Sequence, residues 1–223
     1  MTNSNVIKET YLKLALAVVS CMIAGYLAIN IPWLVAFMQT PLGWLVGMLA
    51  INLITPMCLF VADNPDEGFF SYIMLSMQGI FSGIAVCPLL YLASHVTNGA
   101  ITGEQLIISS IGLTAAIFAL VTAYTFYVGK FWDPGEAMMG ATGLIVLGII
   151  PLNAFVLHSG LLGYVILLLV GLIGAFQLIK GTNEVIEAKE NNSNRAALII
   201  FAGVFNLFQV LLISLFSLFG YRR

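Results

Sequence analysis

The chain is poor in charge. Of its 223 residues, only 8% are Asp, Glu, Lys or Arg, whereas 61% are hydrophobic. Soluble domains carry roughly 25% charged residues, so this chain lacks the charge needed to cover a water-facing surface. Its net charge of −2 provides no broad basic surface, which argues against nucleic-acid binding. We therefore expect a protein whose main solvent is lipid.

Cysteine and catalytic motifs are also scarce. Cys21, Cys58 and Cys87 lie far apart in apolar runs, without Cys-x-x-Cys spacing, so neither a disulfide framework nor a zinc site is predicted. The chain has no His-Glu-x-x-His motif and no Gly-rich phosphate loop. The acidic loop at 62–68 lacks the full ligand pattern of a calcium loop, and we interpret it as a solvated turn. We expect no resident metal, no cofactor and no enzymatic activity.

Long apolar runs are what the chain has in abundance. A bilayer core of about 30 Å needs about 20 helical residues. Runs of this length lie at about 11–30, 42–61, 70–94, 106–128, 137–156, 161–179 and 196–220. They lack the alternating pattern of membrane strands. We predict an all-α integral membrane protein in which 1–223 forms one membrane domain with seven transmembrane helices. The first run is expected to be a retained helix and not a cleaved signal peptide.

Lysine and arginine predict the orientation. Seven spans place one group of basic residues on the side of the N-terminus: Lys8, Lys13, Lys130, Lys180, Lys189 and Arg195. The other side holds Arg222 and Arg223. Because cytoplasmic loops are enriched in Lys and Arg, the N-terminus is expected in the cytoplasm. A re-entrant last run would place every basic residue on one side. That alternative stays open, although 196–220 is longer than a half-depth segment requires.

Small residues recur at a spacing of four in two of the runs. Gly43 and Gly47 lie in the second run, and Gly79 and Gly83 in the third. In lipid, small-xxx-small spacing lets helix backbones approach closely. We expect these glycines to pack helices within the molecule; a homodimer face is the alternative.

The last sixty residues hold the most unusual polar groups. The run 161–179 is followed by a polar stretch that extends to Arg195, which we interpret as a loop, and then by the run 196–220. The polar groups of interest are Thr182, Asn183, Asn206 and Gln209. Asn206 and Gln209 are three apart and therefore share a helix face. That face, with Thr182 and Asn183, would line a hydrated path. The alternative is interhelical hydrogen bonding, worth about 0.6 kcal/mol per bond in membrane proteins.

Four stretches, taken in order along the chain, resemble a known family. They are Ile7-Lys8-Glu9-Thr10-Tyr11, Gln78 to Pro88, Thr114-Ala115-Ala116-Ile117-Phe118 with Thr122 and Tyr124, and Asn206-Leu207-Phe208. Their order and spacing, over nearly the whole chain, resemble the transmembrane Bax inhibitor motif family, of which this chain would be a divergent member.

The resemblance implies a fold and an activity. It implies seven helices with the last one packed centrally among the other six. It also implies a passive, pH-sensitive calcium leak and a role in stress response or cell-death protection. Bacterial relatives include a modulator of a membrane quality-control protease. We therefore expect a bacterial cytoplasmic membrane as the location, the lipid bilayer as the surroundings, and a membrane protease or another membrane protein as the candidate partner.

The family's pH latch is a pair of aspartates, at the end of the sixth helix and within the seventh. Two neighbouring carboxylates in a low dielectric share a proton, which raises one pKa. Aligning the family's motifs on Thr182-Asn183 and on Asn206-Leu207-Phe208 places Gly181 and Gly203 at the aspartate positions. The resemblance thus implies a latch position without its carboxylates.

Two ionisable side chains near the latch position are candidates to titrate in place of the aspartate pair. Glu184 lies close in sequence, and Lys180 is adjacent, although a lysine near a helix end is expected to extend to the interface. Two functions are left open. One is a cation leak with altered gating, and the other is a non-conducting interaction protein that modulates a quality-control protease or a stress response.

Overall fold

The computed structural model describes most of the chain. The described residues are 3–40, 42–43, 46–47, 50, 68–95, 97–98, 101–128, 160–187 and 193–219. The predicted helix 137–156 lies outside them, as do nearly all of the predicted helix 42–61 and of the acidic loop at 62–68.

Long helices dominate the described part of the chain. They are α1 (Asn3–Ile29), α4 (Gly68–Ser94), α5 (Gly103–Val128), α7 (Gly160–Glu187) and α8 (Ser193–Phe219). Each of the five is long and apolar enough to cross a membrane. The prediction of an all-helical membrane protein is confirmed for this part, and five of the seven predicted spans are helices.

Local sequence explains two boundaries that differ from the prediction. Helix α5 begins at Gly103 because Thr102 and Gln105 form a capping box. The Gln105 N–H donates to Thr102 Oγ1 (3.3 Å), and the Thr102 N–H donates to Gln105 Oε1 (2.9 Å). Helix α1 begins at Asn3 and includes the polar stretch before the first apolar run. Glu9 and Lys13 pair there at a spacing of four, which stabilises a helix.

Two short elements were not predicted. Helix α2 (Pro32–Met38) starts after the extended residue Ile31, and Pro32 occupies its first turn, where a missing N–H costs nothing. Strands β1 (Thr97–Asn98) and β2 (Ile101–Thr102) pair antiparallel between α4 and α5.

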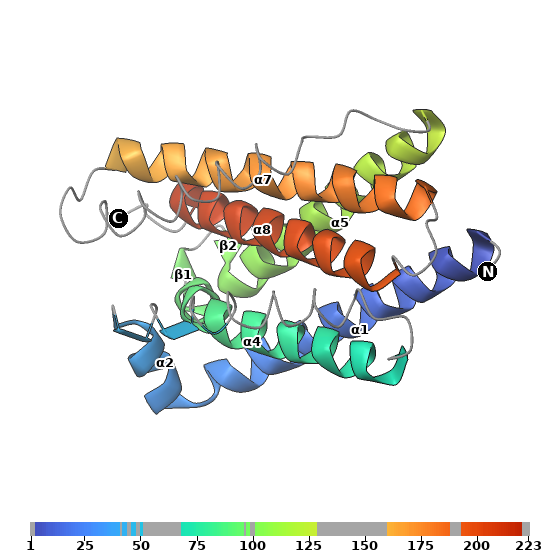
Figure 1. Ribbon diagram of the computed structural model, residues 1–223. Coiled ribbons are helices and arrows are strands. Elements are labelled where there is room, and N and C mark those ends of the chain that lie inside the picture. The colour runs from blue at the N-terminus through green and yellow to red at the C-terminus, as the bar shows by residue number, and fades with distance from the viewer. Residues whose placement is uncertain are drawn as a thin grey trace.

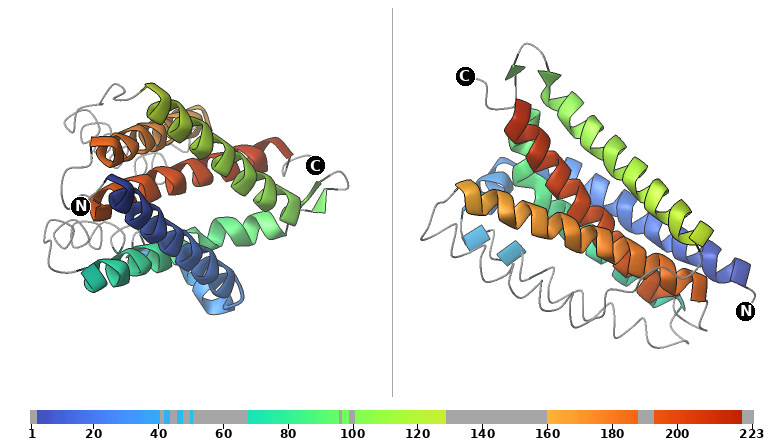
Figure 2. Two further views of the ribbon diagram at one scale, coloured as in Figure 1. Left: turned by 90° about the vertical axis from the view of Figure 1, so that its right-hand side faces the viewer. Right: turned by 90° about the horizontal axis from the view of Figure 1, so that it is seen from above.

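The described helices form a bundle in which α8 contacts each of the other four long helices. Helices α1, α4 and α8 begin at one end of the bundle, and α5 and α7 end there (Figure 1). We call this the N-terminal end. Figure 2 shows the same arrangement from two further directions. Helix α8 is also the most enclosed span, with 44% of its most apolar stretch buried, against 11% for α7.

Glycines bring α1 and α4 together. A Cβ placed on Gly79 would overlap the carbonyl oxygen of Ala17, and one on Gly83 would overlap that of Cys21. The expected close packing is therefore confirmed for these two glycines, which lie against α1 within the molecule. Gly43 and Gly47 likewise lie against α2, beside Phe37 and Met38.

The core lies where the first half of α8 meets α1, α4 and α7. Its buried side chains include Leu14, Leu75, Leu178, Val185, Ala197, Ile200 and Phe201. Large apolar side chains such as Leu12, Leu120 and Leu168 are more than half exposed on the outside. Lipid covers such side chains without penalty, so the exposed apolar surface fits a membrane-spanning bundle.

Candidate functional site

The end of α7 differs from the prediction. The polar stretch from Lys180 to Asn183 was expected to leave the helix, but α7 continues through it to Glu187. The prediction of a loop is therefore wrong for Lys180 to Glu187, and also for Ser193 to Arg195, with which α8 begins. Packing against the first turns of α8 outweighs their polar character. Thr182 also satisfies its hydroxyl within the helix, because Oγ1 donates to the Leu178 carbonyl at 2.7 Å.

The two glycines at the aligned latch positions lie at separate points of one tight helix crossing. Gly181 lies against Ala196 and Ile200. Gly203 lies against Gly174 and Leu178. A Cβ on Gly203 would be 2.8 Å from the Gly174 carbonyl oxygen and 3.0 Å from the Leu178 nitrogen. These distances leave no room for a carboxylate-bearing side chain at position 203 in this packing.

Helices α7 and α8 are close at Gly181 and at Gly174, and their spacing widens from Gly174 toward the start of α7. A Cβ on Gly181 would meet an Ile200 side-chain carbon at 2.5 Å, one on Gly174 would meet the Gly203 oxygen at 3.0 Å, and one on Gly171 would meet Val210 at 3.5 Å. A Cβ on Gly160 would meet nothing within 4 Å. The crossing is therefore closed at the latch positions and opens toward the start of α7.

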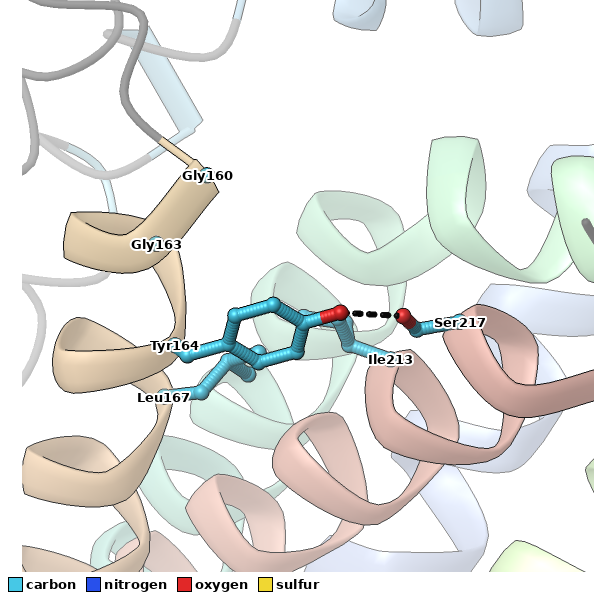
Figure 3. Close-up of a pocket in the computed structure, with 6 residues that line it drawn as sticks. All are labelled: Gly160, Gly163, Tyr164, Leu167, Ile213 and Ser217. Atoms are coloured by element: carbon cyan, nitrogen blue, oxygen red, sulfur yellow. Dashed lines mark hydrogen bonds between the residues drawn. The ribbon is translucent and has the colours of Figure 1, made fainter.

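A groove of about 370 Å³ occupies the open part of this cleft. Its lining residues are Gly160, Gly163, Tyr164, Leu167, Ile213 and Ser217. The Tyr164 and Ser217 hydroxyls form a hydrogen bond of 3.0 Å across the groove, from α7 to α8 (Figure 3). The tight crossing at Gly174 and Gly203 separates this groove from the N-terminal end.

The predicted polar group divides into two parts. Asn206 is half-buried and donates from Nδ2 to Gln177 Oε1 at 2.9 Å, which is an interhelical hydrogen bond. Gln209 is half-buried one turn further along α8. Thr182 and Asn183 are buried near the N-terminal end, more than one turn of α7 beyond Gln177. Asn206 thus fits the alternative of interhelical hydrogen bonding, whereas the Thr182 hydroxyl bonds within α7.

The two candidate replacements for the latch have other roles. Lys180 is only 6% exposed, so the expectation that it extends to the interface is wrong; the protein encloses it near the end of α7. Glu184 forms an ion pair with Arg195, with 3.3 Å between Oε1 and Nε. The Glu184 carboxylate therefore joins the end of α7 to the first turn of α8.

Sequence reasoning missed two contributors to the crossing. Gln177 interrupts the apolar run 161–179, and a polar residue in such a run is a usable signal because it needs a partner in lipid. Gly174 completes the close approach at Gly203, but nothing in one sequence distinguishes it from the other glycines of α7.

A partly buried polar cluster at the N-terminal end was also missed. We call Glu9, Lys13, Tyr72 and Ser193 the Lys13 cluster. The Lys13 Nζ donates to Ser193 Oγ at 3.0 Å, lies 3.6 Å from Glu9 Oε2, and lies 5.0 Å from the centre of the Tyr72 ring. The Ser193 hydroxyl donates to Glu9 Oε2 at 3.3 Å. The signal in the sequence is Lys13 itself, because a charge inside an apolar run needs a partner.

Comparison with known proteins relates the chain to a family. The family profile described as "Inhibitor of apoptosis-promoting Bax1" matches residues 3–222. A search of curated proteins gave no match. The matched range covers nearly the whole chain and includes all five long helices and the α7–α8 crossing.

Proposed function

The chain belongs to the Bax inhibitor-like transmembrane family, and on this premise we propose that it is a passive calcium or cation leak whose resting state is closed by helix packing in place of an aspartate latch. The observation that carries the proposal is the contact at the aligned latch positions. There Gly181 lies against Ile200 and Gly203 against Gly174, so backbone and apolar atoms fill the positions of the carboxylate pair.

Buried polar side chains support a cation path through the bundle. Besides those at the crossing and in the Lys13 cluster, they are Thr10, Ser71, Gln78, Ser82, Ser110, Thr114 and Thr125. Polar groups enclosed within a membrane bundle are costly and are usually retained for a function. The hydroxyls of Ser110, Thr114 and Thr125 each donate to a carbonyl one turn back, so the closed state satisfies them without water. Oxygen atoms are also the ligands that calcium prefers.

The directions of the described helices support seven spans. The end of α1 and the start of α4 lie at opposite ends of the bundle, as do the end of α5 and the start of α7 (Figures 1 and 2). The predicted spans 42–61 and 137–156 fall in these two intervals. The contacts of α8 with α1, α4, α5 and α7 support a central position for the last helix.

The basic residues support a cytoplasmic N-terminus. Within the described part of the chain, the Lys and Arg residues are Lys8, Lys13, Lys180 and Arg195. All lie toward the N-terminal end of the bundle, which the positive-inside rule assigns to the cytoplasm. With a bacterial cytoplasmic membrane as the proposed location, the leak would admit cations to the cytoplasm down their gradient.

Calcium uptake into liposomes tests the proposed leak. Purified protein in liposomes that contain a calcium indicator should give uptake well above that of protein-free liposomes made from the same lipids. An ionophore added at the end confirms that the liposomes are sealed. Uptake indistinguishable from that of protein-free liposomes would reject the leak.

A non-conducting interaction protein is the second candidate. The observation that favours it is an exposed apolar stripe on α7, made of Leu161, Tyr164, Val165, Leu168 and Leu172. These positions repeat at three- and four-residue intervals, which is the spacing by which one helix packs on another. A membrane protease, or a partner in stress response, would dock there. Neither candidate requires enzymatic chemistry, and we propose none.

Photocrosslinking tests the second candidate. A photoreactive residue at Leu168, used in native membranes, should capture a discrete partner protein, whereas the same residue at Leu120 on α5 serves as a lipid-exposed control. Recovery of only lipid and self-contacts from Leu168 would count against a docking role.

A further inference from the structure

We propose that the Lys13 cluster is the release point of α8: it holds the first turn of α8 in the closed packing, and disruption of its charge pair frees that turn. The inference rests on the proposed leak, because it identifies what keeps the closed crossing in place. The cluster joins three helices at one atom, since Lys13 Nζ contacts groups of α1, α4 and α8.

The cluster forms a closed set of contacts. Lys13 Nζ donates to Ser193 (3.0 Å), Ser193 donates to Glu9 (3.3 Å), and Glu9 lies 3.6 Å from Lys13 Nζ. The Tyr72 ring, 5.0 Å from Nζ, is within the range of a cation–π contact. Ser193 is the first residue of α8, so these contacts act on the start of that helix.

The two charges differ in exposure. The Lys13 side chain is 4% exposed, whereas that of Glu9 is 41% exposed. If Lys13 is removed, the Glu9 carboxylate remains accessible to water or lipid headgroups. If the Glu9 charge is removed, the Lys13 ammonium stays enclosed beside the Ser193 hydroxyl and the Tyr72 ring. An uncompensated buried charge of this kind is strongly destabilising. Loss of the Glu9 charge should therefore disturb α8 more than loss of Lys13.

The first turn of α8 is also held from its other side. Arg195 pairs with Glu184 of α7 at 3.3 Å, while Ser193 is held by α1. The next residues on α8 are those that close the latch position, because Ala196 and Ile200 lie against Gly181. Release of Ser193 thus loosens the part of α8 that closes the crossing at Gly181.

Hydrogen–deuterium exchange of the full-length protein in nanodiscs tests the inference. The amides to follow are those of 197–201, because the first four N–H groups of a helix have no intrahelical partner. We expect Glu9→Gln to accelerate their exchange on the order of tenfold. Lys13→Met should accelerate it less, and the double variant should lie below Glu9→Gln because it leaves no buried charge. The control is Lys8→Met, which removes an exposed lysine from the same helix.

Equal exchange in Glu9→Gln and Lys8→Met would overturn the inference, and so would a larger effect of Lys13→Met than of Glu9→Gln. If Glu9→Gln does not fold, Ser193→Ala takes its place, since it removes one hydroxyl and leaves both charges; faster exchange supports the inference and unchanged exchange rejects it.

Calcium uptake is measured on the same variants. If exchange is faster in Glu9→Gln but no variant takes up calcium, the release point is supported and the leak is rejected. If calcium is taken up but exchange is unchanged in Glu9→Gln, the leak is supported and the release point is rejected.

Discussion

Replacing Gly203 with alanine puts a methyl group where the backbones of α7 and α8 meet. The new Cβ would lie 2.8 Å from the Gly174 carbonyl oxygen and 3.0 Å from the Leu178 nitrogen. Both atoms belong to the backbone, so the helices themselves must move apart. Overpacking of this kind lowers the free energy of unfolding by roughly 1–3 kcal/mol, and the better helix propensity of alanine offsets up to about 1 kcal/mol of this loss. The expected net loss of stability therefore lies between about zero and about 3 kcal/mol.

The chain provides matched controls for this substitution. A Cβ on Gly171 would meet only Val210 side-chain atoms, at 3.5 and 3.9 Å, which is ordinary contact on the same helix pair. A Cβ on Gly112 would meet nothing within 4 Å. Gly171→Ala and Gly112→Ala should be neutral or stabilising by up to about 1 kcal/mol. Chemical unfolding in detergent micelles, followed by circular dichroism, measures all three variants. A Gly203→Ala protein as stable as Gly171→Ala would refute the close approach at the latch position.

Two further predictions concern a hydrogen bond and the orientation. The Asn206–Gln177 hydrogen bond should contribute about 0.6 kcal/mol in a double-mutant cycle of Asn206→Leu and Gln177→Leu, measured by the same unfolding assay; a coupling near zero would contradict the contact. For the orientation, Lys8→Cys and Glu104→Cys are each placed in a protein whose native cysteines are replaced. A membrane-impermeant thiol reagent added to intact cells should label Glu104→Cys, at the start of α5, and should reach Lys8→Cys only after permeabilisation; the reverse pattern would contradict a cytoplasmic N-terminus.

Most of the described fold was predictable because the hydropathy of a run depends only on the residues of that run. A run such as 70–94 is apolar and long enough to require a helix in lipid, whatever its neighbours are. The end of α7 was not predictable in this way. Lys180 to Asn183 has the composition of a loop, and the packing of Gly181 against α8, which favours the helix, joins residues that no local pattern pairs.

The candidate site was predictable in part. The resemblance aligns Gly181 and Gly203 with the family's aspartates, but it does not indicate that Gly174 lies opposite Gly203. The contact of Lys13 with Ser193 joins residues 180 positions apart, and no local pattern reveals such a pairing. A charge in an apolar run shows that a partner is needed without showing which residue provides it.

The pH profile of calcium uptake tests the central claim most directly, because a leak closed by helix packing has no carboxylate pair to titrate at the crossing. Uptake by protein-containing liposomes should exceed that of protein-free liposomes and should vary less than about threefold between about pH 6 and pH 8. A carboxylate latch that titrates in this range would change its protonation ratio roughly tenfold per pH unit. A steep, tenfold or greater dependence of uptake on pH would contradict a latch position closed by Gly181 and Gly203.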